Sequence, residues 1–238
     1  MKYVFLLGTL IGCGSVGPSD PDASPFKLSG DDAGGACNAN LTGVIRDFSS
    51  SHPDFEKVIA DDRGIVKSLL GADFKPVYAS ATNTPTTSGK ANFDQWYRDT
   101  PGVNFTSLFK IALTNGVYDN PEFFPIDNQG WGNEGQPHNY WFTFELHTTF
   151  VYKGGETYTF VGDDDLWTFI NGHLAIDIGG VHPAETESVS LDDKATEFGL
   201  VVGKTYPLDI FTAERHTVAS DIRIETSIAF NNCNPIIH

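Results

Sequence analysis

The most informative segment of the sequence is Val161-Gly162-Asp163-Asp164-Asp165-Leu166-Trp167-Thr168-Phe169-Ile170-Asn171-Gly172. Residues 166–170 are a short apolar run that predicts a buried strand, and Asn171-Gly172 is typical of a tight hairpin turn. Three carboxylates lie in a loop directly before this strand. Because adjacent like charges repel, the loop indicates either a solvated acidic turn or a site for a hard cation such as calcium, which prefers oxygen ligands.

The flanking sequence carries further strand patterns. The clearest alternation is in residues 142–148, where Phe142, Phe144 and Leu146 point one way and the intervening polar residues point the other way. This pattern predicts a half-buried antiparallel strand. Further strands are expected at 43–48, 105–114, 157–161, 174–177, 187–191, 205–211 and 222–228, and short helices at 51–56 and 92–98. Short strands separated by turns predict an all-β fold, an antiparallel β-sandwich with one or two short helices in its N-terminal half.

The composition supports an all-β domain and excludes one class of partner. The chain has 238 residues, of which 40% are hydrophobic, and its 24 Gly and 13 Pro favour strands and turns. Its formal net charge of -16 argues against nucleic acid, whose phosphates need a basic surface. The same charge permits the binding of cations.

The first residues predict export. A short basic start and an apolar run end in Leu10-Ile11-Gly12-Cys13, which resembles the lipobox of bacterial lipoproteins. We therefore expect a signal peptide at 1–12 and lipidation of Cys13, which would anchor the protein in a membrane at the bacterial cell surface or in the periplasm-facing outer membrane. The alternative is an ordinary signal peptide that is cleaved further along. A Gly/Ser/Pro/Asp-rich tether follows at 13–40, then the folded domain at 41–232 and a tail at 233–238.

Two more cysteines bracket the domain. In an oxidising compartment Cys37 and Cys233 could form a disulfide, Cys37-Cys233, and the alternative is two free thiols. A loop of this length would restrict the unfolded chain by roughly 4–5 kcal/mol in the chain-entropy model.

Several separated motifs together resemble the fibro-slime domain. They are Thr87-Ser88-Gly89-Lys90-Ala91-Asn92-Phe93-Asp94-Gln95-Trp96-Tyr97-Arg98-Asp99, Phe123-Phe124-Pro125-Ile126-Asp127, Glu145-Leu146-His147, Tyr152-Lys153-Gly154-Gly155-Glu156, Gly162-Asp163-Asp164-Asp165-Leu166-Trp167, Gly179-Gly180-Val181-His182 and Ala213-Glu214-Arg215-His216. The resemblance covers about residues 41–230. It implies kinship with the protective-antigen β-sandwich of yeast flocculins and other adhesins, and therefore a jelly-roll-like fold, carbohydrate binding and adhesion.

The resemblance also implies a calcium site. In flocculin-type members two adjacent Asp residues, joined by a cis peptide, hold a calcium ion that coordinates sugar hydroxyls. Asp163 and Asp164 match that pair, and Asp165 stands where Gly is usual. In a second loop the adhesins use Asn, and Glu214 occupies the matching position. Glu214 also offers oxygen, but it would fill coordination space that a sugar hydroxyl could use.

Other readings of the same residues stay open. Asp163 and Glu214 could instead pair with Arg215 or a lysine, as buried acids often do. His182 and His216 with carboxylates would suit zinc, although no ligand spacing typical of zinc is present, or each could hydrogen-bond its own loop. The expected rim of the ligand site comprises Asp165, His182, Arg215, His216 and Trp131.

Three classes of function remain. The first is a calcium-dependent glycan-binding or adhesion module, whose partners would be surface glycans or matrix polysaccharide. The second is a structural matrix protein in which calcium only stiffens loops. The third is a glycan hydrolase, but such enzymes need two carboxyl groups facing each other across a cleft, which adjacent Asp residues do not supply, and no common hydrolase motif is present. We therefore expect no enzyme activity.

Overall fold

The computed structural model describes residues 40–236. The elements in order are β1 (Asn40–Phe48), β2 (Ala60–Asp61), α1 (Lys90–Phe93), β3 (Asn104–Ala112), β4 (Val117–Asn120), β5 (Phe142–Val151), β6 (Thr157–Gly162), β7 (Asp165–Ile170), β8 (His173–Ile178), β9 (Gly180–Val181), β10 (Glu185–Ser190), α2 (Leu191–Phe198), β11 (Thr205–Glu214), β12 (Ile222–Thr226) and β13 (Phe230–Asn232). The predicted signal segment 1–12, Cys13, Cys37 and the tether up to residue 39 lie outside the described residues and stay predictions.

The strands form two main sheets. The larger has the order β3-β1-β5-β11-β7-β8, with β13 also paired to β5, and the smaller has the order β10-β6-β12-β4. A two-stranded sheet joins β2 to β9. The pairings between these strands are antiparallel. The prediction of an antiparallel β-sandwich is confirmed.

The helices differ from the expectation. The predicted helix at 92–98 is shorter and begins earlier, as α1, and residues 51–56 form turns rather than a helix. α2 lies in the C-terminal half, where strands but no helix were predicted. It follows β10 without a break and ends at Gly199, whose φ of 67° is the left-handed conformation that commonly ends a helix. No helix within residues 40–236 is long and apolar enough to cross a membrane.

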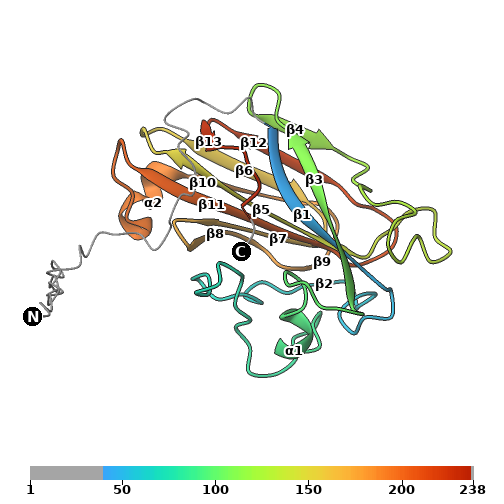
Figure 1. Cartoon of the computed structure of the whole chain (residues 1–238). Coiled ribbons are helices and arrows are strands. Elements are labelled where there is room, and N and C mark those ends of the chain that lie inside the picture. The colour runs from blue at the N-terminus through green and yellow to red at the C-terminus, as the bar shows by residue number, and fades with distance from the viewer. Residues whose placement is uncertain (1–39, 237–238) are drawn as a thin grey trace, which may run out of the picture. The chain divides into compact units, whose positions relative to one another are not determined.

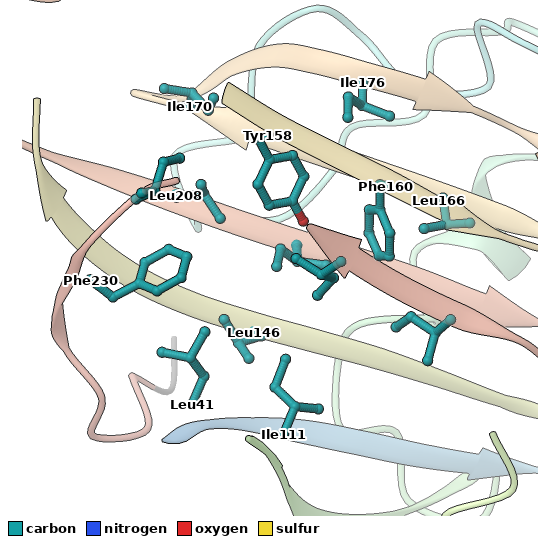
Figure 2. Close-up of a cluster of buried hydrophobic side chains, with 14 of the residues drawn as sticks. Leu41, Ile111, Leu146, Tyr158, Phe160, Leu166, Ile170, Ile176, Leu208 and Phe230 are labelled. Carbon is teal, nitrogen blue, oxygen red and sulfur yellow. The ribbon is translucent and has the colours of Figure 1, made fainter. Parts of the chain in front are cut away.

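The main core lies between the two large sheets. It contains buried side chains from both, including Leu146, Leu208 and Ile170 on the larger sheet and Tyr158 and Phe160 on the smaller. Figure 2 shows these side chains converging, with the Tyr158 hydroxyl among them. The apolar side chains of the alternating pattern in residues 142–148 therefore face the core between the two sheets.

The other face of the larger sheet is also covered. The segment between β1 and β3, which carries β2 and α1, lies along this face (Figure 1). Its Phe93, Trp96 and Tyr97 form a second cluster with Trp167 and Phe211 of the sheet. The burial of Trp96 and Trp167 side by side therefore fixes the long N-terminal segment to the sheet.

This cover corrects the prediction of a half-buried strand, because nearly all of β5 is buried. The polar side chains that were expected to face solvent are neutralised instead. The Lys75 ammonium lies 2.7 Å from both carboxylate oxygens of Glu145, and Arg46 Nη1 lies 3.0 Å from Glu145 Oε1. His147 Nδ1 lies 2.7 Å from Asp209 Oδ1. Alternation alone cannot tell a solvated polar face from one covered by matched charges.

At the C-terminal end, Cys233 packs against the main core and is disulfide-bonded. Since Cys37 lies outside the described residues, the pairing of Cys37 with Cys233 itself stays a prediction.

Candidate functional site

The acidic loop connects β6 of the smaller sheet to β7 of the larger sheet. β7 and β11 pair with Asp165 opposite Ala213, so the loop before β7 meets the loop after β11. Asp163 Oδ1 accepts a hydrogen bond of 2.7 Å from the backbone N–H of Asp221, and Asp164 Oδ2 accepts one of 2.7 Å from that of Arg215. The two loops that were expected to share an ion are thus already joined by the Asp163-Asp164 pair.

The backbone of this loop departs from one implied feature. Residues 40–236 contain no cis peptide bond, so the Asp163–Asp164 peptide is trans and not cis as the flocculin resemblance implied. Asp164 has a φ of 50°, in the left-handed region that Asp tolerates better than most residues. This conformation turns the chain sharply at the second acid, immediately before β7 begins.

A small hollow, with room for about one water molecule and partly open to solvent, lies between the two loops. Its polar lining comes from Asp163, Glu214, Ser220 and Asp221, and its apolar lining includes Phe123. The Glu214 side chain is deeply placed, since the residue is only 5% exposed. The structure therefore brings the predicted ligand Glu214 to the same hollow as Asp163.

Burial and mutual repulsion raise the pKa values of these acids. Burial raises the pKa of Asp163 to about 6, and burial, with further repulsion from Asp165 and Asp163, raises that of Asp164 to about 7 despite the attraction of Arg215. The pKa of Glu214 lies well above its usual value because the side chain is buried beside Asp164 and Asp163. Three carboxylates thus share one low-dielectric region in which their charges are poorly compensated.

The donor chemistry of this region suits calcium, which binds carboxylate and carbonyl oxygens. A bound cation would remove the repulsion that raises the three pKa values. However, in the described part of the chain no three His, Cys, Asp or Glu side chains already surround one point as metal ligands do. Asp163, Asp164 and Glu214 therefore fit calcium by their chemistry and proximity, and they would have to reorient to coordinate it together.

Asp165 and Arg215 do not form a rim, because both side chains are fully buried. Arg215 Nε lies 2.5 Å from Asp165 Oδ2, and the backbone N–H of Gly180 donates to Asp165 Oδ1 at 2.9 Å. Arg215 Nη1 also donates to the backbone carbonyls of Asp54 and Thr86, at 3.0 and 2.6 Å. Arg215 therefore pairs with Asp165, and not with Asp163 or Glu214 as the alternative supposed. Its bonds to Asp54 and Thr86 also connect the segment between β1 and β3 to the site.

The two histidines beside the site bond their own loops. His182 Nδ1 donates to the Pro183 carbonyl and His216 Nδ1 to the Thr217 carbonyl, both at 2.9 Å. His182 is buried, and its Nε2 has no hydrogen-bond partner among the described residues. His216 Nε2 lies 3.8 Å from a carboxylate oxygen of Glu56. Neither histidine is brought into a set of zinc ligands.

Trp131 is exposed but belongs to another part of the surface. Its ring lies 5.4 Å from that of Phe105 on β3, the outermost strand of the larger sheet. Ser220 and Asp221 also line the hollow and were not predicted. Their position in the sequence, between Glu214 and the strand at 222–226, is the feature that could have indicated them.

The chain is similar to known families and proteins. The family model for the PA14 domain matches residues 113–236, just over half of the chain. Protein psiR of Dictyostelium discoideum is 40% identical over 215 residues, which cover 80% of this chain and 21% of psiR. Protein psiD of the same organism is 35% identical over 252 residues, covering 97% of this chain and 47% of psiD. The chain thus spans less than half the length of either relative.

Two solved PA14 domains are similar at low sequence identity. One is described as a PA14 sugar-binding domain from an RTX adhesin, with 12% identity, a TM-score of 0.36, and coverage of 80% of this chain and 93% of that one. The other is the PA14 domain of the MpAFP antifreeze protein, with 11% identity, a TM-score of 0.36, and coverage of 88% and 92%. None of the comparisons supports the bacterial lipoprotein that the N-terminal motif predicts.

Proposed function

The chain belongs to the PA14 domain family, and from this premise we propose that it is a calcium-dependent carbohydrate-binding or adhesion module, not an enzyme. Carbohydrate is the ligand class that the fibro-slime and flocculin resemblance implies. In this proposal Asp163, Asp164 and Glu214 hold the ion between the loop before β7 and the loop after β11.

One observation carries the proposal: Asp163 and Glu214 line one hollow at the meeting point of two loops, and the buried Asp164 lies close enough to both to repel them. Burying even one unpaired charge is costly, and a protein normally neutralises such a group or pairs it. The buried cation of this region, Arg215, already forms its ion pair with Asp165. Calcium, when bound, would supply the missing positive charge and open positions for ligand oxygens.

The role of each acid follows from its contacts. One carboxylate oxygen of Asp163 and one of Asp164 each accept a hydrogen bond from a backbone N–H of the opposite loop, and the second oxygen of each would bind the ion. Glu214 would bind the ion from its position at the end of β11. A sugar would then reach the ion only from the solvent side, past Asp163, which is less buried than the other two.

The depth of Glu214 supports a second function, a structural matrix protein whose calcium only stiffens the loops. A carboxylate that is 5% exposed can occupy coordination positions without leaving any for a sugar. The two functions differ in one measurable respect, because the structural role predicts calcium binding without glycan binding.

Export and anchoring are part of the proposal. A surface-exposed module fits the signal segment at 1–12 and the tether at 13–40. Lipidation of Cys13 would be lost in Cys13→Ser, as followed by labelling with a fatty-acid probe. Labelling that persists in this variant would place the anchor elsewhere.

A glycan array tests the proposed function. The full chain is applied with calcium and with a chelator, beside Asp164→Asn and the control Asp193→Asn, which removes the same charge from an exposed position on α2. The proposal expects binding with calcium that is weakened by chelator and in Asp164→Asn but kept in Asp193→Asn. Binding that ignores both calcium and Asp164 would contradict it, and an array without any signal would favour the structural role.

A further inference from the structure

Two exposed aromatic side chains form a pair at the edge of the larger sheet. Trp131 is 41% exposed and Phe105 is 53% exposed, and their ring centroids are 5.4 Å apart. The other three tryptophans, Trp96, Trp141 and Trp167, are at most 2% exposed. Large aromatic rings are costly to leave in water, so a fixed, exposed pair calls for a physical reason.

The turn that presents Trp131 is held rigidly. The backbone N–H of Trp131 donates to Asp47 Oδ2 at 2.5 Å, and Asn139 Nδ2 donates to Asp47 Oδ1 at 2.7 Å. Gly130 has a φ of 57°, and a Cβ at this position would overlap the Asp47 carboxylate. On the far side of the turn, Glu134 Oε2 accepts a hydrogen bond of 2.9 Å from the Ser50 backbone.

This anchoring comes at an energetic cost. Asp47 is 3% exposed, and its burial raises its pKa to about 6. Burying a carboxylate costs free energy, which the hydrogen bonds from Trp131 and Asn139 offset only in part. The anchor thus pre-organises the Trp131 ring beside Phe105, which lowers the entropy cost of placing a flat ligand against it.

The pair lies in register with the candidate calcium site but apart from it. Phe105 pairs with Asp47, Asp47 with Phe142, and Phe142 with Glu214, so these four residues form one row across β3, β1, β5 and β11. Three inter-strand spacings separate Phe105 from Glu214, which is about 14 Å. A single sugar ring is too short to touch both.

We propose that Trp131 and Phe105 form a second carbohydrate subsite, on which the apolar face of a pyranose ring stacks without calcium. The proposal rests on the carbohydrate class of the proposed function and adds the size of the ligand: an oligosaccharide of several rings, rather than a monosaccharide, reaches both subsites. Flat aromatic rings suit the flat C–H face of a sugar. Gln129 is exposed on the same turn and can contribute a polar group for the sugar hydroxyl groups, whereas the Asn133 amide is already bonded to the backbone of Asn128 and Pro137.

Iodide quenching of tryptophan fluorescence reports mainly on the accessibility of Trp131, because it is the one tryptophan of the four with substantial exposure. The full chain is titrated with cellohexaose, chitohexaose, laminarihexaose and mannohexaose in the presence of a chelator. We expect at least one hexasaccharide to protect Trp131 from iodide, and the corresponding monosaccharide to protect it far less.

Variants then assign the effect. Calorimetry with the protecting hexasaccharide should show an affinity about tenfold weaker in Trp131→Ala, the loss expected when about 60 Å² of apolar contact disappears. Phe105→Ala should weaken binding as well. Leu108→Ala is the matched control, since Leu108 is 57% exposed on the same strand but points to the opposite face, and its affinity should not change.

Each contrary result overturns the subsite. These results are no protection by any of the four hexasaccharides, equal binding by Trp131→Ala, or a change in sedimentation of Trp131→Ala that reveals a protein interface instead. The failure of this inference is distinguishable from failure of the proposed function. If Asp164→Asn loses calcium-dependent binding while Trp131→Ala binds the hexasaccharide as tightly as wild type, only the second subsite is wrong. If binding needs Trp131 but is neither strengthened by calcium nor weakened in Asp164→Asn, only the calcium role is wrong.

Discussion

Replacing Asp165 with asparagine should lower the free energy of unfolding by about 3 kcal/mol, because it leaves the buried guanidinium of Arg215 without its partner. Breaking a buried ion pair from one side typically costs about 3–5 kcal/mol. Two contacts place the expected value at the lower end. Asparagine can still accept the hydrogen bond of 2.9 Å from Gly180, and Asp164 also attracts Arg215.

The pair itself contributes little net stability, which a double variant can reveal. Burial raises the pKa of Asp165 to about 6 even beside Arg215, so desolvation outweighs the attraction between them. Asp165→Asn combined with Arg215→Met should therefore be less destabilised than the sum of the single changes. It should not reach wild-type stability, because the carbonyls of Asp54 and Thr86 lose their donor.

Urea unfolding of the full chain measures these values, with Asp193→Asn as the control for an exposed acid. Calcium titration of the same variants separates stability from binding. Asp165→Asn, once folded, should bind calcium within about threefold of wild type, since Asp165 is assigned to Arg215 rather than to the ion. The reasoning would be refuted by a loss below about 1 kcal/mol, or by a variant of normal stability that no longer binds calcium.

Two further predictions concern pH and the aromatic turn. Without calcium, the free energy of unfolding should fall as pH rises from about 4 to about 7. The reason is that the folded-state pKa values of Asp163, about 6, and Asp164, about 7, exceed the usual value of 3.8, so the folded state holds protons that the unfolded state releases. Urea unfolding at pH 5 and pH 8 would check this, and a clear rise in stability with pH would count against it. Gly130→Ala should cost about 1–3 kcal/mol and increase iodide quenching of Trp131, because it forces a strained φ and a clash with Asp47; unchanged stability would show that the turn is not held as described.

The sequence was sufficient for the longer strands and for the hairpin turn after residue 170, but not for the short strands β2, β4, β9 and β13. The apolar run before Asn171-Gly172 is β7, and Asn171 and Gly172 have φ values of 50° and 75°, as a tight hairpin turn of this kind requires. The hydrophobic periodicity of a strand and the residue preferences of a turn depend on a few neighbouring residues, so a single sequence is enough to recognise them. The approach of Glu214 to the Asp163-Asp164 loop required an analogy with a family, because it depends on which strands become neighbours.

What the sequence did not reveal depends on contacts between distant segments. Asp165 is identical in type to Asp163 and Asp164, yet only Asp165 faces Arg215 and the cover formed by the segment after β1. Likewise, nothing in the alternation of β5 indicates that Lys75, seventy residues earlier, neutralises Glu145. Such pairs are set by tertiary packing, which a periodic pattern does not encode.

Calorimetric titration of the full chain with calcium measures whether an ion binds between the two loops. We predict one ion per chain, binding that is lost in Asp163→Asn, Asp164→Asn and Glu214→Gln, and binding that is unchanged in Asp193→Asn. A chain that takes up no calcium, or that binds it equally well in all four variants, would contradict a calcium site between these two loops.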